Sequence, residues 1–211
     1  MKAPLPITVA ILLGGQSSRF GSPKAFLDWN GKSLAAHIAG TALPVVSEVL
    51  FVGKAKDQIP PDAKSLGWFA ADAPNFPGPL AGLAAALSQA SKPWVFLTGV
   101  DMPYINEKTL REFWLLREKS VLLDAAVPYR EDRWQPLCAL WNRHSLKSLE
   151  ASTWNSFQHF LNEGGLKIMK VEEGTLRSWD PELRCLRSFN TPEELKQLQN
   201  LEPQSSRSTQ S

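Results

Sequence analysis

Glycines and cations gather directly after an apolar run near the beginning of the sequence. The stretch LLGGQSSRFGSPK, residues 12–24, contains Gly14, Gly15, Gly21, Arg19 and Lys24. Glycine has no Cβ atom to keep a ligand away from the backbone, and consecutive N–H groups in a turn form a concave site for anions. Arginine and lysine add positive charge to such a site. The stretch therefore predicts a loop that binds phosphate groups.

Two familiar phosphate-binding loops differ from this one. The Walker A pattern G-x-x-x-x-G-K-[ST] needs a lysine directly after its last glycine, but Ser22 and Pro23 separate Gly21 from Lys24. The dinucleotide pattern G-x-G-x-x-G follows none of the predicted strands. The sequence thus favours neither an ATPase nor a nicotinamide dehydrogenase. A glycine-rich turn whose charges are merely solvated remains the alternative.

Two carboxylates stand at the ends of other apolar runs. We predict strands at residues 7–14, 48–53, 67–72 and 94–103. The third of these strands ends at Asp72, and the fourth reaches Asp101. In a parallel sheet the carboxyl ends of the strands lie along one edge, where ligands bind. We therefore expect Gly14, Gly53, Asp72 and Asp101 to lie together, although each carboxylate could instead only cap a turn.

Strands and helices alternate along the chain, which predicts an α/β fold with a doubly wound, mostly parallel sheet. We expect further strands at residues 124–129, 137–142 and 166–171. We expect helices at residues 34–43, 79–90, 106–119, 145–150, 154–163 and 190–201. Ser33 is a suitable N-cap for the first helix, Pro79 opens the second, and Asn190 or Thr191 caps the last. Residues 1–202 are predicted to form one domain, followed by a disordered polar tail, residues 203–211.

Composition excludes several classes of function. The 211 residues carry a formal net charge of +2 and no long basic run, so nucleic acid is not an expected partner. No stretch approaches the roughly 20 apolar residues that span a bilayer. A signal peptide is not expected either, because Pro4 and Pro6 precede the first apolar run and no small-residue cleavage site follows it. We expect a cytoplasmic protein that does not bind membranes. Cys138 and Cys185 lack the spacing of a zinc site and are expected to be reduced.

Five segments in order resemble one family. The first is the loop L-x-G-G-x-S-x-R-x-G-x-x-K, and FPGPLAGL, VDMPYI, QPLCALW and FNTPEEL follow it. The loop resembles the signature of nucleotidyltransferases that activate sugars, phosphocholine, isoprenoid precursors and molybdopterin. More narrowly, the sequence resembles the molybdenum cofactor guanylyltransferase family from residue 7 to about residue 200. The resemblance implies a three-layer αβα, Rossmann-like nucleotidyltransferase (GT-A-like) fold with a mostly parallel central sheet.

The resemblance also implies roles for particular residues. The nucleotide contacts carry over to Leu12, Leu13, Gly14, Gly15, Lys24, Asp72 and Asp101. Catalytic roles carry over to Arg19, Lys24 and Asp101, with Asp101 binding Mg²⁺. Asn190 lies where the family approaches its pterin substrate. The charged loop REDRWQP adds Arg130, Arg133 and Gln135 as further candidates for an anionic pterin, unless its charges are only solvated, and Trp134 either stacks on a ring or covers the core.

The implied reaction moves GMP from GTP to the terminal phosphate of molybdopterin and releases pyrophosphate. A phosphate acceptor is already anionic, so the reaction needs positioning and charge neutralisation instead of a strong base. Two positions depart from the family: Leu13 replaces a small residue, and Gly53 replaces an asparagine that is common near the nucleotide. By the same resemblance, the pair Gly14-Gly15 favours guanine over cytosine, because the cytidylyl relatives tend to have alanine before the final glycine.

Two other functions remain open at this point. One is a cytidylyl or sugar-phosphate transferase of the same fold. The other is a non-catalytic module that binds a nucleotide or molybdopterin and delivers it to partner enzymes. Under either the catalytic or the delivery hypothesis, the expected partners are proteins of molybdenum cofactor biosynthesis or the molybdoenzymes that receive the cofactor.

Overall fold

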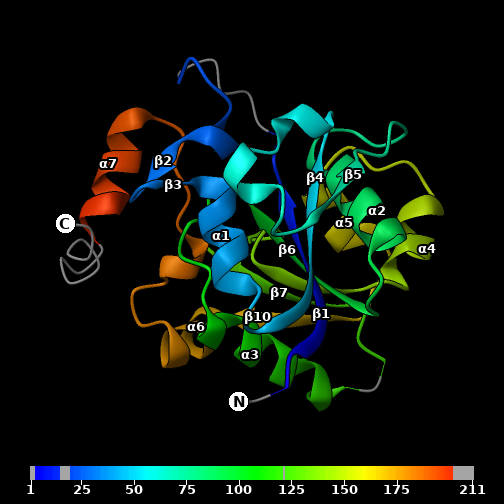
Figure 1. The fold of residues 1–211 in the computed structure, drawn as a ribbon. Helices are drawn as coiled ribbons and strands as arrows, with labels where there is room; N and C mark the ends of the chain where they lie inside the picture. Colours follow the sequence, from blue (N-terminus) through cyan, green and yellow to red (C-terminus); the bar gives the residue numbers. More distant parts are fainter. Residues whose placement is uncertain (1–2, 15–19, 121, 202–211) are drawn as a thin grey trace.

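The fold is built on one central sheet. A computed structural model describes residues 3–14, 20–120 and 122–201 of the chain. Within these residues, eight strands form a sheet in the order β10-β7-β9-β6-β1-β4-β5, with β8 paired to β7 (Figure 1). The strands are β1 Leu5–Leu12, β4 Val46–Gly53, β5 Trp68–Ala71, β6 Trp94–Gly99, β7 Ala125–Arg130, β8 Arg133–Trp134, β9 Ala139–Asn142 and β10 Ile168–Glu172. A small hairpin, β2 Asp28–Trp29 and β3 Lys32–Ser33, stands apart from it.

Most strand pairs are parallel, as the sequence predicts. Strand β1 lies parallel to both β4 and β6, and the pairs β4–β5 and β7–β10 are parallel too. Strand β9 is antiparallel to both of its neighbours, β6 and β7. Because only residues 131–138 separate β7 from β9, the connection is too short for a parallel crossover. The sheet is therefore mixed on one side of β6 and parallel on the other.

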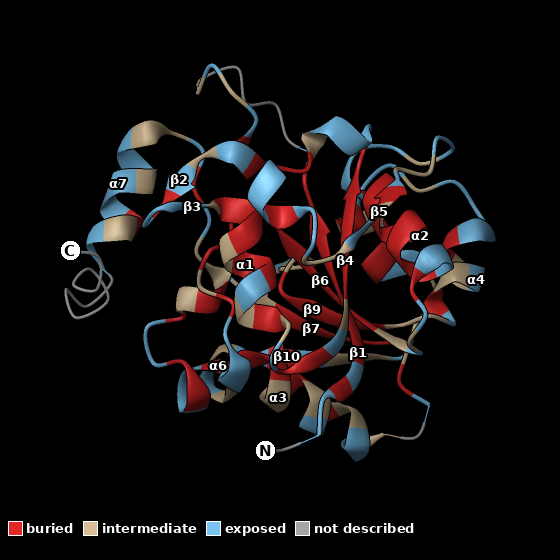
Figure 2. Ribbon diagram, in the orientation of Figure 1, coloured by how far each residue is buried: buried red, intermediate tan, exposed pale blue. Residues whose placement is uncertain are grey.

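Helices cover both faces of the sheet. The helices are α1 Leu34–Ala42, α2 Pro79–Gln89, α3 Glu107–Leu116, α4 Ser145–Glu150, α5 Phe157–Glu163, α6 Glu173–Trp179 and α7 Pro192–Asn200. Along β1, Val9 and Ile11 belong to the apolar core that includes residues of α1, α3 and α6. The alternate residues Ala10 and Leu12 belong to the core that includes α2 and α5. Residues 7–12 of β1 are thus buried on both faces (Figure 2), as in other helix-covered parallel sheets.

Local signals define where the helices begin. The Ser33 hydroxyl accepts a hydrogen bond from the Ala36 N–H at 3.2 Å, which confirms the predicted cap of α1. Pro79 is the first residue of α2, also as predicted. At α7 the cap is Thr191, whose hydroxyl accepts from the Glu194 N–H at 3.2 Å. The Asn190 side chain is therefore not used as a cap.

Several predicted boundaries were wrong. The first strand ends at Leu12 instead of Gly14, and the fourth predicted strand ends at Gly99, where the chain turns and the Met102 N–H donates back to the Gly99 carbonyl at 3.1 Å. Helix α5 begins at Phe157 instead of residue 154, because Ser156 caps it. Helix α6 and strand β8 were not predicted. The predicted polar tail, residues 203–211, lies outside the described residues. None of the helices in the described ranges is long and apolar enough to cross a membrane.

Candidate active site

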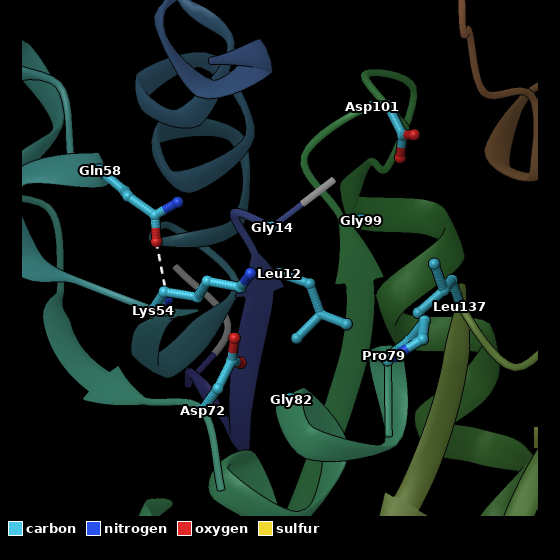
Figure 3. Close-up of a pocket in the computed structure, with 11 residues that line it drawn as sticks. Leu12, Gly14, Lys54, Gln58, Asp72, Pro79, Gly82, Gly99, Asp101 and Leu137 are labelled. Carbon is cyan, nitrogen blue, oxygen red and sulfur yellow. Dashed lines mark hydrogen bonds between the residues drawn. The ribbon is translucent and has the colours of Figure 1, made fainter. Parts of the chain in front are cut away.

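A cavity of about 470 Å³ opens at the carboxyl edge of the sheet (Figure 3). Its volume is within the range of small-molecule sites. The ends of β1, β4, β5 and β6 reach it, together with the N-terminus of α2. Its lining residues are Leu12, Gly14, Lys54, Gln58, Asp72, Gly78, Pro79, Gly82, Gly99, Asp101 and Leu137. The strand ends therefore meet where the topology of a parallel sheet predicts.

Two glycines let the walls of this cavity approach closely. A Cβ atom on Gly82 would lie 2.6 Å from Leu12 Cδ2, so a larger residue in this position of α2 would require the Leu12 side chain to move. A Cβ atom on Gly99 would lie 2.5 Å from Asp101 Oδ1, so glycine also makes room for the carboxylate that folds back over β6. Gly78 precedes α2 with φ +52°, a conformation that favours glycine. Pro79 has no N–H group, and the N–H groups of Leu80 and Ala81 donate to the Pro77 and Gly78 carbonyls at 3.2 Å each, so these three residues offer the cavity no free N–H group.

Lys24 joins three distant parts of the chain. Its Nζ atom lies 2.9 Å from Asp101 Oδ2, 2.6 Å from the Phe189 carbonyl oxygen and 3.1 Å from Asn190 Oδ1. An ammonium group has three hydrogens to donate, and these three acceptors use all of them. The side chain is buried, and Nζ also lies 5.1 Å from the centre of the Phe189 ring. The lysine therefore fixes Asp101 and the segment before α7 in one arrangement.

This arrangement gives Lys24 a role beyond the expected phosphate contact. Its charge is paired with Asp101 and neutralises that carboxylate at the cavity edge. The second carboxylate oxygen, Asp101 Oδ1, receives no hydrogen bond from the described residues and remains available to a ligand. The structure thus brings Lys24, Asp101 and Asn190 together, although they are far apart in the sequence.

Asp72 and Lys54 lie at the opposite end of the cavity from Asp101 (Figure 3). Asp72 directly follows β5, and its N–H donates to the Gly53 carbonyl at 2.8 Å, which continues the pairing of β5 with β4. Burial raises the pKa of the Asp72 carboxyl, and the nearby Lys54 charge opposes that rise. The cavity therefore has a carboxylate at each end, with Leu12 and Gly14 between them.

Three other predicted site residues, Leu13, Arg133 and Gln135, do not line this cavity. The Leu13 side chain is buried in the core, and its N–H donates to the Val52 carbonyl at 2.8 Å. Arg133 lines a separate cavity of about 300 Å³, which shares Gly78 and Pro79 with the first. The Gln135 N–H donates to the Pro128 carbonyl at 2.8 Å. Gly15 and Arg19 fall outside the described residues.

Two side chains of the charged loop, Arg130 and Trp134, contact neighbouring protein groups. Arg130 forms ion pairs with Glu131 at 2.6 Å and with Glu173 at 3.3 Å. The Trp134 ring packs edge-on against Tyr129, and its Nε1 donates to Asn162 at 2.8 Å. These contacts agree with the alternative in which Trp134 covers the core.

Sequence reasoning missed two polar residues of the cavity, Lys54 and Gln58. Both belong to a segment, residues 54–65, that was interpreted as a surface connection because of its prolines and alternating polar residues. Lys54 is the residue directly after β4, so its position at a strand end was a usable signal. Gln58 ends a single 3-10 turn, Lys56–Gln58, for which the sequence has no clear periodic pattern.

Comparisons with known proteins agree with this geometry. A family model described as the MobA-like NTP transferase domain matches residues 9–167. A molybdenum cofactor guanylyltransferase of Vibrio vulnificus is 31% identical and covers 96% of this chain and 100% of its own. Molybdopterin-guanine dinucleotide biosynthesis protein A of Archaeoglobus fulgidus superposes with a TM-score of 0.75 at 26% identity, covering 92% of this chain and 97% of that chain. A cytidylyltransferase of Thermus thermophilus, which acts on 2-C-methyl-D-erythritol 4-phosphate, shares the fold with a TM-score of 0.61 at 17% identity, covering 91% and 96%.

The match to an NTP transferase family model over residues 9–167, together with the shared fold, places this chain in the class of nucleotidyltransferases. More narrowly, the chain belongs to the MobA-like NTP transferase family, and within it to the molybdenum cofactor guanylyltransferases. The predicted fold class and the stated resemblance are both confirmed. The protein is an enzyme of the transferase class.

Proposed function

We propose that this protein transfers GMP from GTP to the terminal phosphate of molybdopterin or its molybdenum form. The products are molybdopterin guanine dinucleotide and pyrophosphate. The observation that carries the proposal is the contact of Lys24 with both Asp101 and Asn190 at the edge of a nucleotide-sized cavity. That contact joins the nucleotide side of the site to the segment that the family resemblance assigns to the pterin.

The reaction forms one P–O bond and breaks another. An oxygen of the acceptor phosphate attacks the α-phosphorus of GTP, and the bond to the β-phosphate oxygen breaks as pyrophosphate leaves. The acceptor is anionic before it reacts, so the protein has to align the two phosphates and balance their charge. We assign the N–H group at Gly14, at the beginning of the glycine-rich loop, to the phosphates. Asp72, at the other end of the cavity, is assigned to the nucleoside.

Asp101 is the residue proposed to hold Mg²⁺. Among the described residues there is no group of three or more His, Cys, Asp or Glu side chains that could form a metal site made only of protein ligands. Mg²⁺ is commonly held by one or two carboxylates together with substrate phosphates and water, and Asp101 Oδ1, which accepts no hydrogen bond from the described residues, fits that mode. When bound, the ion neutralises charge on the triphosphate. Lys24 keeps the carboxylate oriented for it.

The acceptor side is assigned to Asn190, Arg133 and Gln135. Arg133 lines the second cavity, which adjoins the nucleotide cavity at Gly78 and Pro79. We propose that residues 1–202 act as one domain, that the enzyme works in the cytoplasm, and that its product passes to molybdoenzymes or other proteins of cofactor biosynthesis. Arg19 and Gly15 remain proposed contacts of the triphosphate.

Pyrophosphate release from GTP, Mg²⁺ and molybdenum cofactor tests this function. The Asp101→Asn variant is expected to lose activity by about 100-fold or more, because it removes a charge at the phosphates. Glu163→Gln, an exposed residue at the end of α5, is the matched control and should keep full activity. A folded protein that binds GTP but releases no pyrophosphate would favour the delivery module. Protection from thermal unfolding by CTP or UTP, but not GTP, would favour a cytidylyl or sugar-phosphate transferase.

A further inference from the structure

Gln58 is a cavity residue with no role in the reaction proposed above. It is the last residue of the 3-10 turn Lys56–Gln58, and its side chain folds back toward the beginning of that turn. Its Oε1 atom accepts hydrogen bonds from the N–H groups of Lys54, at 2.7 Å, and Ala55, at 3.1 Å. These two bonds satisfy N–H groups that the turn itself leaves free.

The two bonds also decide which way the carboxamide points. Two N–H donors require an oxygen between them, so the identities of Oε1 and Nε2 follow from the hydrogen bonds. The Nε2 atom must then point away from the turn, and Figure 3 shows it directed toward the cavity beside Gly14. Among the described residues it has no hydrogen-bond partner. An oriented donor with no protein acceptor therefore faces the nucleotide cavity.

Gly53 makes this position of Gln58 possible. A Cβ atom on Gly53 would lie 2.6 Å from Gln58 Oε1, which is too close for any other residue type unless the carboxamide moved. Gly53 is buried at the end of β4, so the Gln58 carboxamide occupies the space that a side chain on this strand end would take. The absence of a side chain at Gly53 therefore allows the Gln58 carboxamide to lie at the end of β4.

We infer that Gln58 reads the nucleotide base by donating from Nε2 to a keto oxygen. Guanine presents such an oxygen, O6, where adenine presents an N6–H₂ donor. At position 4, uracil presents a keto oxygen and cytosine presents an N4–H₂ donor. A fixed donor therefore selects keto bases, and the carboxamide discriminates GTP from ATP and CTP. This inference rests on the proposed function, because it places a nucleoside triphosphate in the cavity.

The Gln58→Glu variant separates base reading from a structural role. Glutamate has the same shape and keeps an oxygen for the Lys54 and Ala55 N–H groups, but it replaces the donor with an acceptor. We expect GTP binding to weaken by about 10- to 100-fold and ATP binding to stay equal or tighten, as measured by calorimetry. Gln89→Glu, an exposed site at the end of α2, makes the same charge change and should leave both affinities unaltered.

A nucleotide that lacks O6, 2-aminopurine riboside triphosphate, provides the second measurement. It should bind wild type more weakly than GTP does, and Gln58→Glu should not weaken it further. Equal weakening of GTP and ATP in Gln58→Glu, or no weakening at all, would overturn the inference while leaving guanylyl transfer intact. If GTP binds with the expected Gln58 dependence but no transfer occurs, only the proposed function fails. Absence of all nucleotide binding would overturn both.

Discussion

Replacing Lys24 with methionine removes the ammonium group that joins Asp101 to the segment before α7. Methionine has a similar length and keeps the apolar stem buried, but it leaves Asp101, the Phe189 carbonyl and Asn190 without their shared donor. We expect two effects from one change. The folded state becomes less stable, and the segment before α7 loses its attachment to the sheet edge.

The structure sets the size of the first effect. Hydrogen bonds to a charged group contribute about 1.5–3 kcal/mol each, so a simple sum for three bonds would be roughly 4.5–9 kcal/mol. That sum is too large, because methionine also avoids the cost of burying a charge, and Asp101, whose side chain is 24% exposed, can be hydrated. We expect the free energy of unfolding to fall by roughly 2–4 kcal/mol. For a chain of this size, that corresponds to a Tm roughly 4–16 °C lower.

Urea unfolding measures the stability change, and hydrogen exchange locates it. Exchange in Lys24→Met should accelerate most over residues 189–200, and much less in the central strand β1. Lys54→Met is the matched control, because Lys54 is an exposed lysine of the same cavity with no ion pair among the described residues. Its unfolding free energy should stay within about 0.5 kcal/mol of wild type.

Two results would refute this reasoning. One is an unfolding free energy for Lys24→Met within about 0.5 kcal/mol of wild type. The other is normal exchange over residues 189–200 in a destabilised protein, which would mean that the bonds from Lys24 do not hold this segment.

Three further changes test other parts of the molecule. Gly99→Ala places a Cβ atom 2.5 Å from Asp101 Oδ1, so transferase activity should fall about 100-fold while unfolding stays cooperative; full activity would count against the assigned role of this carboxylate. An NMR titration should place the pKa of Asp72 above its ordinary value of 3.8, since burial raises it, and Lys54→Met should raise it further. Because the folded-state pKa exceeds the unfolded one, Asp72 lowers the unfolding free energy as pH rises through this interval; a pKa at or below 3.8 would contradict this. Gly40→Ala, at an exposed position of α1 with no atom within 4 Å of the new Cβ, should add about 0.5–1 kcal/mol of stability by urea unfolding and leave activity unaltered.

The sequence predicted the fold best where a physical signal was strong. The apolar run of β1 indicates a strand buried on both faces, and Ser33 and Pro79 mark the beginnings of α1 and α2 correctly. Helix α6 was missed because only Leu176 and Trp179 of its seven residues are buried, which is too few for a periodic pattern. Strand β8 was missed because Glu131 and Asp132 adopt positive φ in the turn before it, and a glutamate followed by an aspartate does not predict that turn.

The candidate site was predictable in part. Asp72, Asp101 and Gly14 follow strand ends, and the topology of a parallel sheet brings such positions together. The partners of Lys24 could not be derived in this way, because Phe189 is 165 positions away and no local pattern links the two. Only the family resemblance pointed to Asn190. Gln58 could not be predicted for a different reason. Its carboxamide occupies space that is free only because residue 53 has no side chain.

The contact between Lys24 and Phe189 also orders events during synthesis of the protein. The strand ends that line the cavity from β1, β4, β5 and β6 are all complete by Gly99, whereas the carbonyl that receives Lys24 is made 165 residues after it. From Gly99 to Phe189 the ribosome has 90 residues still to add, which takes roughly 5–20 s at about 5–20 residues per second. During this time the ribosome-bound chain has the nucleotide-facing half of its cavity but not the segment that orients Asp101. We therefore expect the nascent chain to be catalytically silent until its last helix docks.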